Sequence, residues 1–263
     1  MHRFHWRFAL LALALAAIGC RSGFQLRNYP TNEALFQAAL REFERGKWDN
    51  AAAGFEKLTL ELAPRDTLAA RSFWYLGLAR NKQRDYLRAA QAFSRIFESY
   101  PDDSLAERSL YQEGRAYKAM WTRSDRDASY GDAALTTFAS LGTYYPNSIY
   151  KDSVAAQVKD LEAMFAQKDY DTGMYYFRDK AWDSGVVFFR TVLESWPEAP
   201  RARDAALRLI DTYKVLSYKE EMNEVCAAIR PKYPEDPEVT KACPPPAAAA
   251  AKPPTAGDTI TLR

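Results

Sequence analysis

Apolar residues recur along most of the chain at the three- and four-residue intervals of amphipathic helices. The clearest stretch spans residues 72–101, where the small and apolar positions are Phe73, Leu76, Gly77, Tyr86, Ala89, Phe93 and Ile96. Small residues let two helices cross closely, so the pattern predicts a hairpin of two packed helices. Pro101 predicts the end of the second helix, because proline lacks a backbone donor and restricts the residue before it.

The same arrangement recurs along the chain, each time closed by a proline. These positions of glycine, alanine, phenylalanine and proline are those of a tetratricopeptide (TPR) unit. We therefore predict an all-α superhelical solenoid of about five TPR-like helical hairpins over residues 32–240. The predicted repeats are 32–64, 70–101, 107–146, 151–197 and 201–234.

Two departures from a regular array are predicted in the middle of the chain. Counted from Gly114, the closing Pro146 comes eight residues late, which places an insertion in the loop around Trp121–Gly131. Apolar residues then continue at helical spacing from Lys151 to Arg178. This continuity predicts one long helix that opens the fourth repeat.

The first nineteen residues predict a signal peptide, in which a basic start precedes an apolar stretch too short to cross a bilayer. The stretch ends at Ala17-Ile18-Gly19-Cys20, which resembles a bacterial lipoprotein cleavage site. That resemblance implies that Cys20 carries fatty acyl chains such as palmitate and that residues 20–31 form a lipidated tether. The alternative is an ordinary secretory cleavage site nearby, since Ala17 stands where such signals more often carry leucine.

The predicted signal removes both histidines, His2 and His5, from the mature chain. His-activated nucleophiles and His-containing zinc sites are thereby excluded. Removing Arg3 and Arg7 as well lowers the basic residues from 36 to 34, equal to the 34 acidic ones, which argues against nucleic-acid binding. No phosphate-binding loop or CxxC pair is present. We predict a binding protein, not an enzyme, with no metal and no cofactor beyond a covalent lipid on Cys20.

Two other cysteines, Cys226 and Cys243, would lie in an oxidising compartment after export. Either they form a disulfide that ties the end of the chain back to the last repeat, or they are two free thiols. The sequence after Ala242 is rich in proline and alanine and has little to bury. We predict a disordered tail over residues 241–263.

The first helix of each hairpin lines the inner face of a TPR solenoid. In the first three repeats, the outward positions of this helix predict an aromatic and basic groove for an extended peptide with an aromatic side chain and a terminal carboxylate. The alternative is that some of these aromatics pack between helices and the arginines are only solvated. The candidate peptide-binding residues are Phe36, Phe43, Arg71, Trp74, Arg108, Tyr111 and Arg115.

Several short motifs between about Asn32 and Pro234 resemble one family of helical lipoproteins. They are Ser124-Asp125-Arg126-Asp127, Ala133-Ala134 followed by Phe138, Tyr145-Pro146-Asn147-Ser148 followed by Tyr150, Tyr175-Tyr176, Ala181-Trp182 and Arg203-Asp204-Ala205. Together with the signal and the five repeats, they resemble the BamD family, the TPR lipoprotein subunits of the bacterial β-barrel assembly machinery.

That resemblance implies a lipid-anchored scaffold at the periplasmic face of the outer membrane. Its C-terminal repeats would bind the POTRA region of a BamA-like insertase, and its N-terminal repeats the C-terminal signal of unfolded outer-membrane proteins. Other assembly lipoproteins are further expected partners. The insertase-binding candidates, chosen for charge and position, are Arg178, Lys180, Arg190 and Arg203.

Two other functions compete with this interpretation. Another periplasmic TPR lipoprotein adaptor, serving cell-envelope maintenance or pilus assembly, would have the same signal and repeats. A peptidoglycan-modifying enzyme on a helical scaffold is disfavoured, because the mature chain would lack histidine and the sequence shows no second domain.

Overall fold

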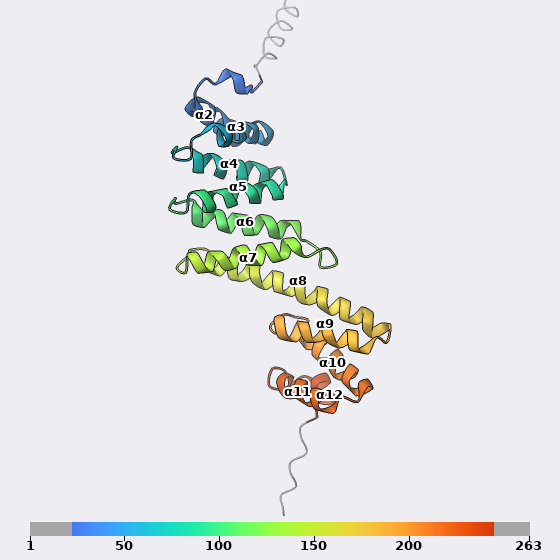
Figure 1. Cartoon of the computed structure of the whole chain (residues 1–263). Coiled ribbons are helices and arrows are strands. Elements are labelled where there is room, and N and C mark those ends of the chain that lie inside the picture. The colour runs from blue at the N-terminus through green and yellow to red at the C-terminus, as the bar shows by residue number, and fades with distance from the viewer. Residues whose placement is uncertain (1–22, 245–263) are drawn as a thin grey trace, which may run out of the picture. The chain divides into compact units, whose positions relative to one another are not determined.

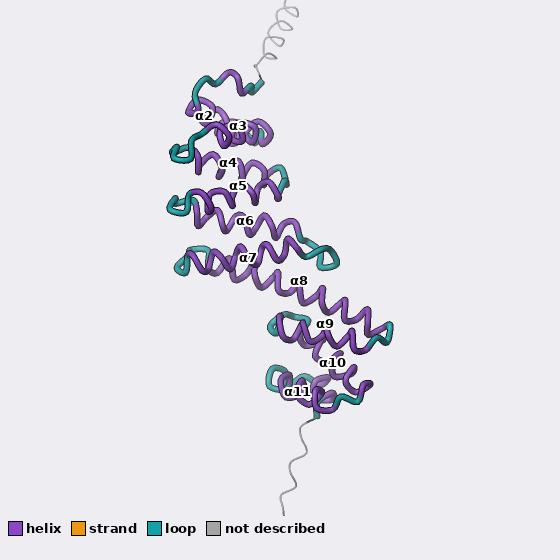
Figure 2. Tube along the Cα trace, in the orientation of Figure 1, coloured by secondary structure: helices purple, strands orange, loops and turns teal. Residues whose placement is uncertain are grey.

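A computed structural model describes residues 23–244, which fold into helices joined by turns and loops (Figures 1 and 2). No strand occurs among these residues, so the predicted all-α class is confirmed. The long helix predicted from Lys151 to Arg178 is also confirmed. The described α-helices are α2 (Asn32–Glu44), α3 (Trp48–Glu61), α4 (Ala69–Lys82), α5 (Tyr86–Ser99), α6 (Ala106–Met120), α7 (Ser129–Tyr144), α8 (Lys151–Arg178), α9 (Trp182–Ser195), α10 (Ala202–Leu216), α11 (Lys219–Ile229) and α12 (Pro237–Ala242).

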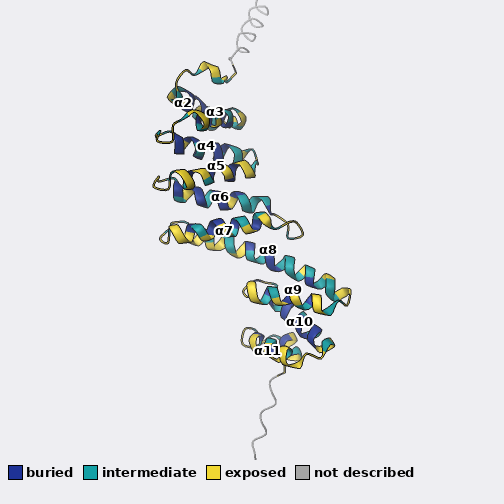
Figure 3. Ribbon diagram, in the orientation of Figure 1, coloured by how far each residue is buried: buried dark blue, intermediate teal, exposed yellow. Residues whose placement is uncertain are grey.

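The described residues divide into two compact units. Unit 1 comprises residues 23–122 and 129–155, and unit 2 comprises residues 123–128 and 156–244. In unit 1, α2 to α7 stack in chain order as three helical hairpins (Figure 1). Unit 2 contains the rest of α8 together with α9 to α12. Within each unit most of the buried residues lie on the helices (Figure 3).

Side-chain caps fix where several helices begin. At the start of α2, Thr31 Oγ1 accepts a hydrogen bond from the backbone nitrogen of Ala34 at 3.2 Å. Asp85 caps α5 in the same way, and Asp236 caps α12. Each cap satisfies a backbone donor that the first turn of a helix leaves without a partner.

A left-handed residue occurs in the turn inside four of the five helix pairs. Gly46, Arg84, Lys180 and Ser217 have φ angles of 71°, 63°, 60° and 63°. This conformation costs a residue other than glycine about 1–2 kcal/mol. Its use by arginine, lysine and serine shows that packing of the two helices, more than local preference, sets the turn.

A glycine and a phenylalanine interlock at the centre of three helix pairs. A Cβ built on the glycine would stand 2.5–2.7 Å from the nearest atom of the ring, closer than carbon atoms pack. The rings are buried, so they have little room to move. Any side chain at these positions would push the two helices apart. The pairs are Gly77 with Phe93, Gly114 with Phe138 and Gly173 with Phe189.

The loop between α6 and α7 lies where the sequence predicts an insertion. Its first residue, Trp121, is buried. Residues 123–128 belong to unit 2, where Lys168 Nζ on α8 donates to the carbonyl oxygens of Ser124 at 3.4 Å and Arg126 at 2.9 Å. The insertion is therefore fixed to the long helix.

Part of the predicted tether, residues 20–31, packs against the first helix pair. Phe24, Leu26 and Tyr29 pack against the buried cluster beneath α2 and α3, and a 3-10 turn, η2, spans Leu26–Asn28. Isolated apolar residues in a short polar segment gave too weak a pattern to predict this contact. Cys20 and the predicted signal lie outside the described residues.

The boundary of the C-terminal tail also differs from the prediction. Lys241 and Ala242 belong to α12, and Cys243 is buried, so the packed part of unit 2 extends past residue 241. The physical reason is the buried side chain of Val239, which gives this short helix an apolar contact with unit 2. The rest of the predicted tail, from residue 245, lies outside the described residues.

Replacing Gly114 with alanine should destabilise the protein, because the new methyl group would collide with the ring of Phe138. Overpacking of this kind lowers the free energy of unfolding by about 1–3 kcal/mol, and the better helix propensity of alanine offsets about 1 kcal/mol of that loss. We expect a lower Tm in thermal unfolding followed by circular dichroism.

Gly142 in α7 provides the matched control, since no atom lies within 4 Å of its added Cβ. Gly142→Ala should therefore raise the Tm through helix propensity alone. Equal effects of the two substitutions would contradict the interlock.

Candidate functional site

Three arginines of unit 1, Arg71, Arg108 and Arg115, each stack on an aromatic ring; we call them the arginine ladder. Arg71 and Arg108 occupy the third position of α4 and α6, and each reaches back to a ring on the first helix of the preceding pair. Arg115 covers a ring one turn earlier on its own helix. The distances from guanidinium carbon to ring centroid are 4.8 Å for Arg71 over Phe36, 5.5 Å for Arg108 over Trp74 and 5.6 Å for Arg115 over Tyr111.

Two tyrosines extend the arginine ladder beside α6. Tyr150, just before α8, stacks on Tyr111 with ring centroids 4.4 Å apart and planes 12° from parallel. The Nε of Arg108 also donates a hydrogen bond to Tyr150 Oη at 3.4 Å. The two half-buried rings therefore form a platform next to two guanidinium groups.

The arginine ladder keeps most of its hydrogen-bond donors available. All three arginines are exposed, and none forms an ion pair within the described part of the chain. Arg115 donates one bond, at 3.4 Å, to the neutral side chain of Gln112. A guanidinium has five N–H donors in a planar fork that matches a carboxylate. The arrangement can therefore hold an anionic group against aromatic surface.

The structure corrects the predicted role of the aromatic residues. Phe36 and Trp74 are 0% and 8% exposed, so neither ring can be a main contact surface for a peptide. Phe43 is half-buried between Trp48 and Tyr75, with ring centroids 5.1 and 5.5 Å away. Large rings gain more free energy from burial between helices than from a solvated groove. The surface thus presents guanidinium groups with the rings beneath them.

Glu113 places a buried carboxyl group on α6, where the previous repeat has Leu76. The side chain is 9% exposed and lies near Glu98 of α5. Burial, with a smaller contribution from the negative charge of Glu98, raises the pKa of Glu113 to about 8. Burial and the same two carboxylates also raise the pKa of Tyr117.

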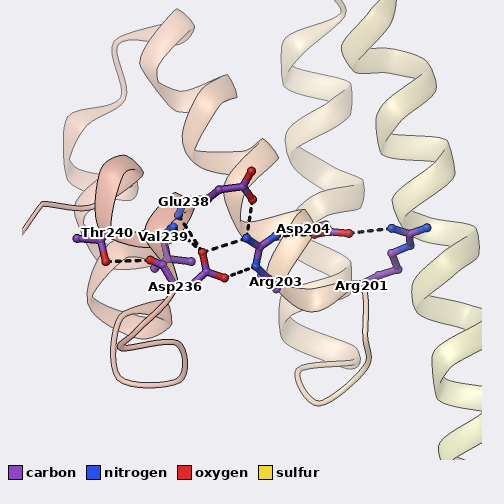
Figure 4. A network of polar contacts seen from close by, with 7 residues as sticks. All are labelled: Arg201, Arg203, Asp204, Asp236, Glu238, Val239 and Thr240. Carbon is purple, nitrogen blue, oxygen red and sulfur yellow. Dashed lines mark hydrogen bonds and ion pairs between the residues drawn. The ribbon is translucent and has the colours of Figure 1, made fainter.

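In unit 2, Arg203 fixes α12 to α10 (Figure 4). Its Nε and Nη2 donate to the two carboxylate oxygens of Asp236 at 2.6 and 3.0 Å. It also bonds Glu238 and Asp204. The hydrogen bond from Arg203 lowers the pKa of Asp236 to about 2, and its acidic partners raise the pKa of Arg203. The donors of Arg203 are thus used within unit 2, and its binding to a partner stays a prediction that the structure does not test.

The other predicted insertase contacts are spread over α8 and α9. Arg178 ends α8, and Lys180 occupies the left-handed position of the following turn; both are exposed. Arg190 is exposed on α9, where it pairs with Glu194 at 3.4 Å. Arg190 also belongs to the rim of a cavity that the sequence did not predict.

That cavity, the α9–α11 groove, lies among α9, α10 and α11 and has a volume of about 250 Å³. Small residues on α10 leave the space open, because alanine does not fill the distance between neighbouring helices. Its apolar lining includes Leu193, Ala206, Leu209, Val225 and Ile229. Its charged residues are Arg190, Glu194, Glu224 and Lys232.

Cys226 and Cys243 form a disulfide in the structure, with Cα atoms 5.3 Å apart. The bond joins α11 to the residue that follows α12. Together with Arg203, it holds the last described residues on unit 2.

No group of three or more His, Cys, Asp or Glu residues is placed to hold a metal ion in the part of the chain that the structure describes. Among the helices described here, none combines the length and the apolar character needed to cross a bilayer.

Comparison with known proteins assigns the family. The sequence model of the YfiO family, which is described as "Outer membrane lipoprotein", matches residues 29–227, well over half of the chain. The chain belongs to this outer membrane lipoprotein family. The match runs from the segment before α2 into α11 and includes the arginine ladder and most of the α9–α11 groove.

Several curated proteins similar to this chain are named outer membrane protein assembly factor BamD. One from Xylella fastidiosa is 25% identical, with 78% of this chain and 73% of the relative covered. One from Caulobacter vibrioides is 22% identical over 78% of this chain and 67% of the relative. One from Vibrio cholerae is 24% identical over 79% of this chain and 89% of the relative.

Solved structures that resemble the chain are more distant. The TPR2AB domain of yeast Sti1 in its pHSP90 complex has a TM-score of 0.41 and 15% identity, over 80% of this chain and 81% of that one. A tetratricopeptide repeat protein from Parabacteroides merdae has a TM-score of 0.36 and 14% identity, over 80% and 70%.

Replacing Glu113 with glutamine should remove a pH-dependent loss of stability. The native carboxyl stays protonated up to about pH 8, whereas an unperturbed glutamate ionises near 4.5. Between these values the native state binds more protons than the unfolded state, so the free energy of unfolding falls as pH rises, by up to roughly 1.4 kcal/mol per pH unit. We expect the advantage of Glu113→Gln over the native protein to grow from about pH 5 to about pH 8.

Denaturant unfolding at the two pH values measures this difference. Glu44→Gln is the control, because Glu44 is exposed and does not contribute to the raised pKa of Glu113. If the native protein and Glu113→Gln lost stability in parallel, the buried carboxyl would not be the cause.

Proposed function

We propose that this protein is a scaffold lipoprotein of outer membrane protein assembly that binds other proteins and performs no catalysis. Its family membership and the names of its relatives support a role in this assembly. In this proposal Cys20 carries the lipid anchor and the repeats lie on the periplasmic side of the outer membrane. The arginine ladder is the observation that carries the client-binding part of the proposal.

The proposed client is the C-terminal signal of an unfolded β-barrel protein, a peptide that ends in an aromatic residue and a carboxylate. The three exposed guanidinium groups supply unpaired donors for the carboxylate. The platform of Tyr111 and Tyr150 supplies a surface for the aromatic side chain, through stacked or edge contacts. An extended peptide lying across α4 and α6 could use both at once.

Energetics favour a carboxylate over a neutral group at this surface. A hydrogen bond to a charged partner is worth about 1.5–3 kcal/mol, roughly twice a neutral one. The aromatic rings beneath the guanidinium groups exclude water from one side of each arginine, which strengthens its attraction to an anion. The ladder also keeps the arginine side chains ordered before binding, which reduces the entropy cost.

For the insertase side, we propose that the α9–α11 groove receives part of a POTRA region. Its apolar floor offers burial, and the charges around it offer selectivity. Arg190 lies at this groove, and Arg178 and Lys180 remain exposed basic residues of the same unit. Arg203 has no part in this proposal.

Substituting all three arginines of the ladder with alanine should weaken client binding by about tenfold to a hundredfold, since at least one charge-assisted bond is lost. Titration calorimetry with a peptide from the C-terminus of an outer-membrane barrel protein measures the affinity. The matched control removes three other exposed arginines of unit 1, Arg65, Arg88 and Arg95. A similar loss in both triple variants would show that net charge, and not the ladder, attracts the peptide.

Recovery of the protein from detergent-solubilised membranes tests the insertase side. Ala228→Arg would fill the α9–α11 groove and should reduce co-purification of a barrel-type insertase several-fold. Ala227→Arg changes the neighbouring exposed residue, which does not line the groove, and should leave recovery unchanged. Recovery of only cell-wall or pilus proteins would contradict the proposal and favour a different envelope adaptor.

A further inference from the structure

The α9–α11 groove lies beside the point where the chain leaves the described part of unit 2. Cys243 is bonded to Cys226 on α11, the helix that supplies Val225 and Ile229 to the groove. The carbonyl oxygen of the next residue, Pro244, accepts a hydrogen bond from Arg230 Nη1 at 3.4 Å, also from the end of α11. The root of the C-terminal segment is therefore attached to one wall of the groove.

The remaining chain is long enough to return to this groove. Nineteen residues, 245–263, follow the root. An extended chain advances about 3.3 Å per residue, so the segment could span roughly 60 Å. The first part, rich in proline and alanine, can act as a spacer. The length of the segment is therefore sufficient for the last residues to contact the α9–α11 groove.

The end of this segment matches the chemistry of the groove. Ile260 and Leu262 are the only large aliphatic residues between positions 245 and 263, and they alternate within Thr259–Arg263. An alternating segment presents both side chains on one face when extended. The side chain of Arg263 follows directly, so these residues also carry a positive charge.

Charges of both signs also line the groove. Glu224 forms no ion pair among the described residues and can attract the guanidinium of Arg263. The other charges are already paired, Arg190 with Glu194 at 3.4 Å and Lys232 with Glu198 at 2.7 Å. The groove, with a volume of about 250 Å³, has room for an aliphatic side chain on its apolar floor. The two aliphatic side chains thus match the apolar floor of the groove, and Arg263 matches Glu224 at its rim.

We propose that residues 259–263 bind in the α9–α11 groove of their own chain, with Ile260 and Leu262 on its apolar floor. Because the disulfide holds the root on α11, the segment would be present at an effective concentration in the millimolar range. Even weak contacts could then keep the groove occupied. Any partner that uses the groove would have to displace this segment, which makes it a built-in competitor.

Photocrosslinking in the full chain tests this proposal. A diazirine-bearing aliphatic residue replaces Leu262, and peptide mass spectrometry locates the crosslinks. We expect intramolecular crosslinks to α9, α10 and α11 at groove residues. Ala228→Arg should reduce their yield by about tenfold, while Ala227→Arg should leave it unchanged. Circular dichroism and thermal unfolding check that both variants fold.

Three results would overturn the proposal. Crosslinks to a second copy would show that the groove binds the segment of another chain. Crosslinks outside the groove, or no crosslinks, would show that the segment does not bind there. A similar yield in both arginine variants would show that contact does not depend on the groove. The proposal does not rest on insertase binding: loss of insertase recovery without loss of crosslinks, or the reverse, separates the two.

Discussion

The contact between a glycine and a phenylalanine inside a helix pair is the constraint on which the rest of the structure depends. With Gly77 against Phe93 and Gly114 against Phe138, the paired helices approach more closely than any side chain would permit. The contact within α4–α5 brings α6 near enough for Arg108 to cover Trp74. Across α2–α3, where Gly54 fits closely against Ala39, Arg71 covers Phe36 in the same way. A loss of the close approach would separate the rings from the guanidinium groups, so the surface chemistry of unit 1 follows from its packing.

Arginine side chains have different neighbours in the two units: carboxylates surround Arg203 in unit 2, and aromatic rings lie beneath the ladder in unit 1. In unit 2, Arg203 donates hydrogen bonds to Asp236, Glu238 and Asp204, and these bonds hold α12 against α10. In unit 1, the ladder has aromatic rings as neighbours and no acidic partner among the described residues. An aromatic ring orients a guanidinium without consuming its N–H donors. Such an arrangement costs little stability and keeps the positive charge available for a carboxylate from another chain.

The sequence predicted the helices well because their pattern is local. Periodicity and closing prolines located the hairpins and gave Lys151–Arg178 its bounds. Contacts between repeats were harder to predict: a position facing outward from one helix, such as that of Phe36 or Trp74, is covered by the next pair. The ion pairs of Arg203 could not be predicted because its partner Asp236 is 33 residues away. The groove could not be predicted because small residues on α10 are compatible with close packing and with open space alike.

The most direct test of the central claim compares two peptides that differ only at the C-terminus. Both carry the last residues of a barrel protein and end in phenylalanine, but one has a free carboxylate and the other an amide. If the arginine ladder holds the carboxylate, amidation should weaken binding by at least about tenfold, the equivalent of one charge-assisted hydrogen bond. The Arg71/Arg108/Arg115 alanine variant should then bind both peptides equally weakly. Equal affinity of the native protein for acid and amide would contradict the account.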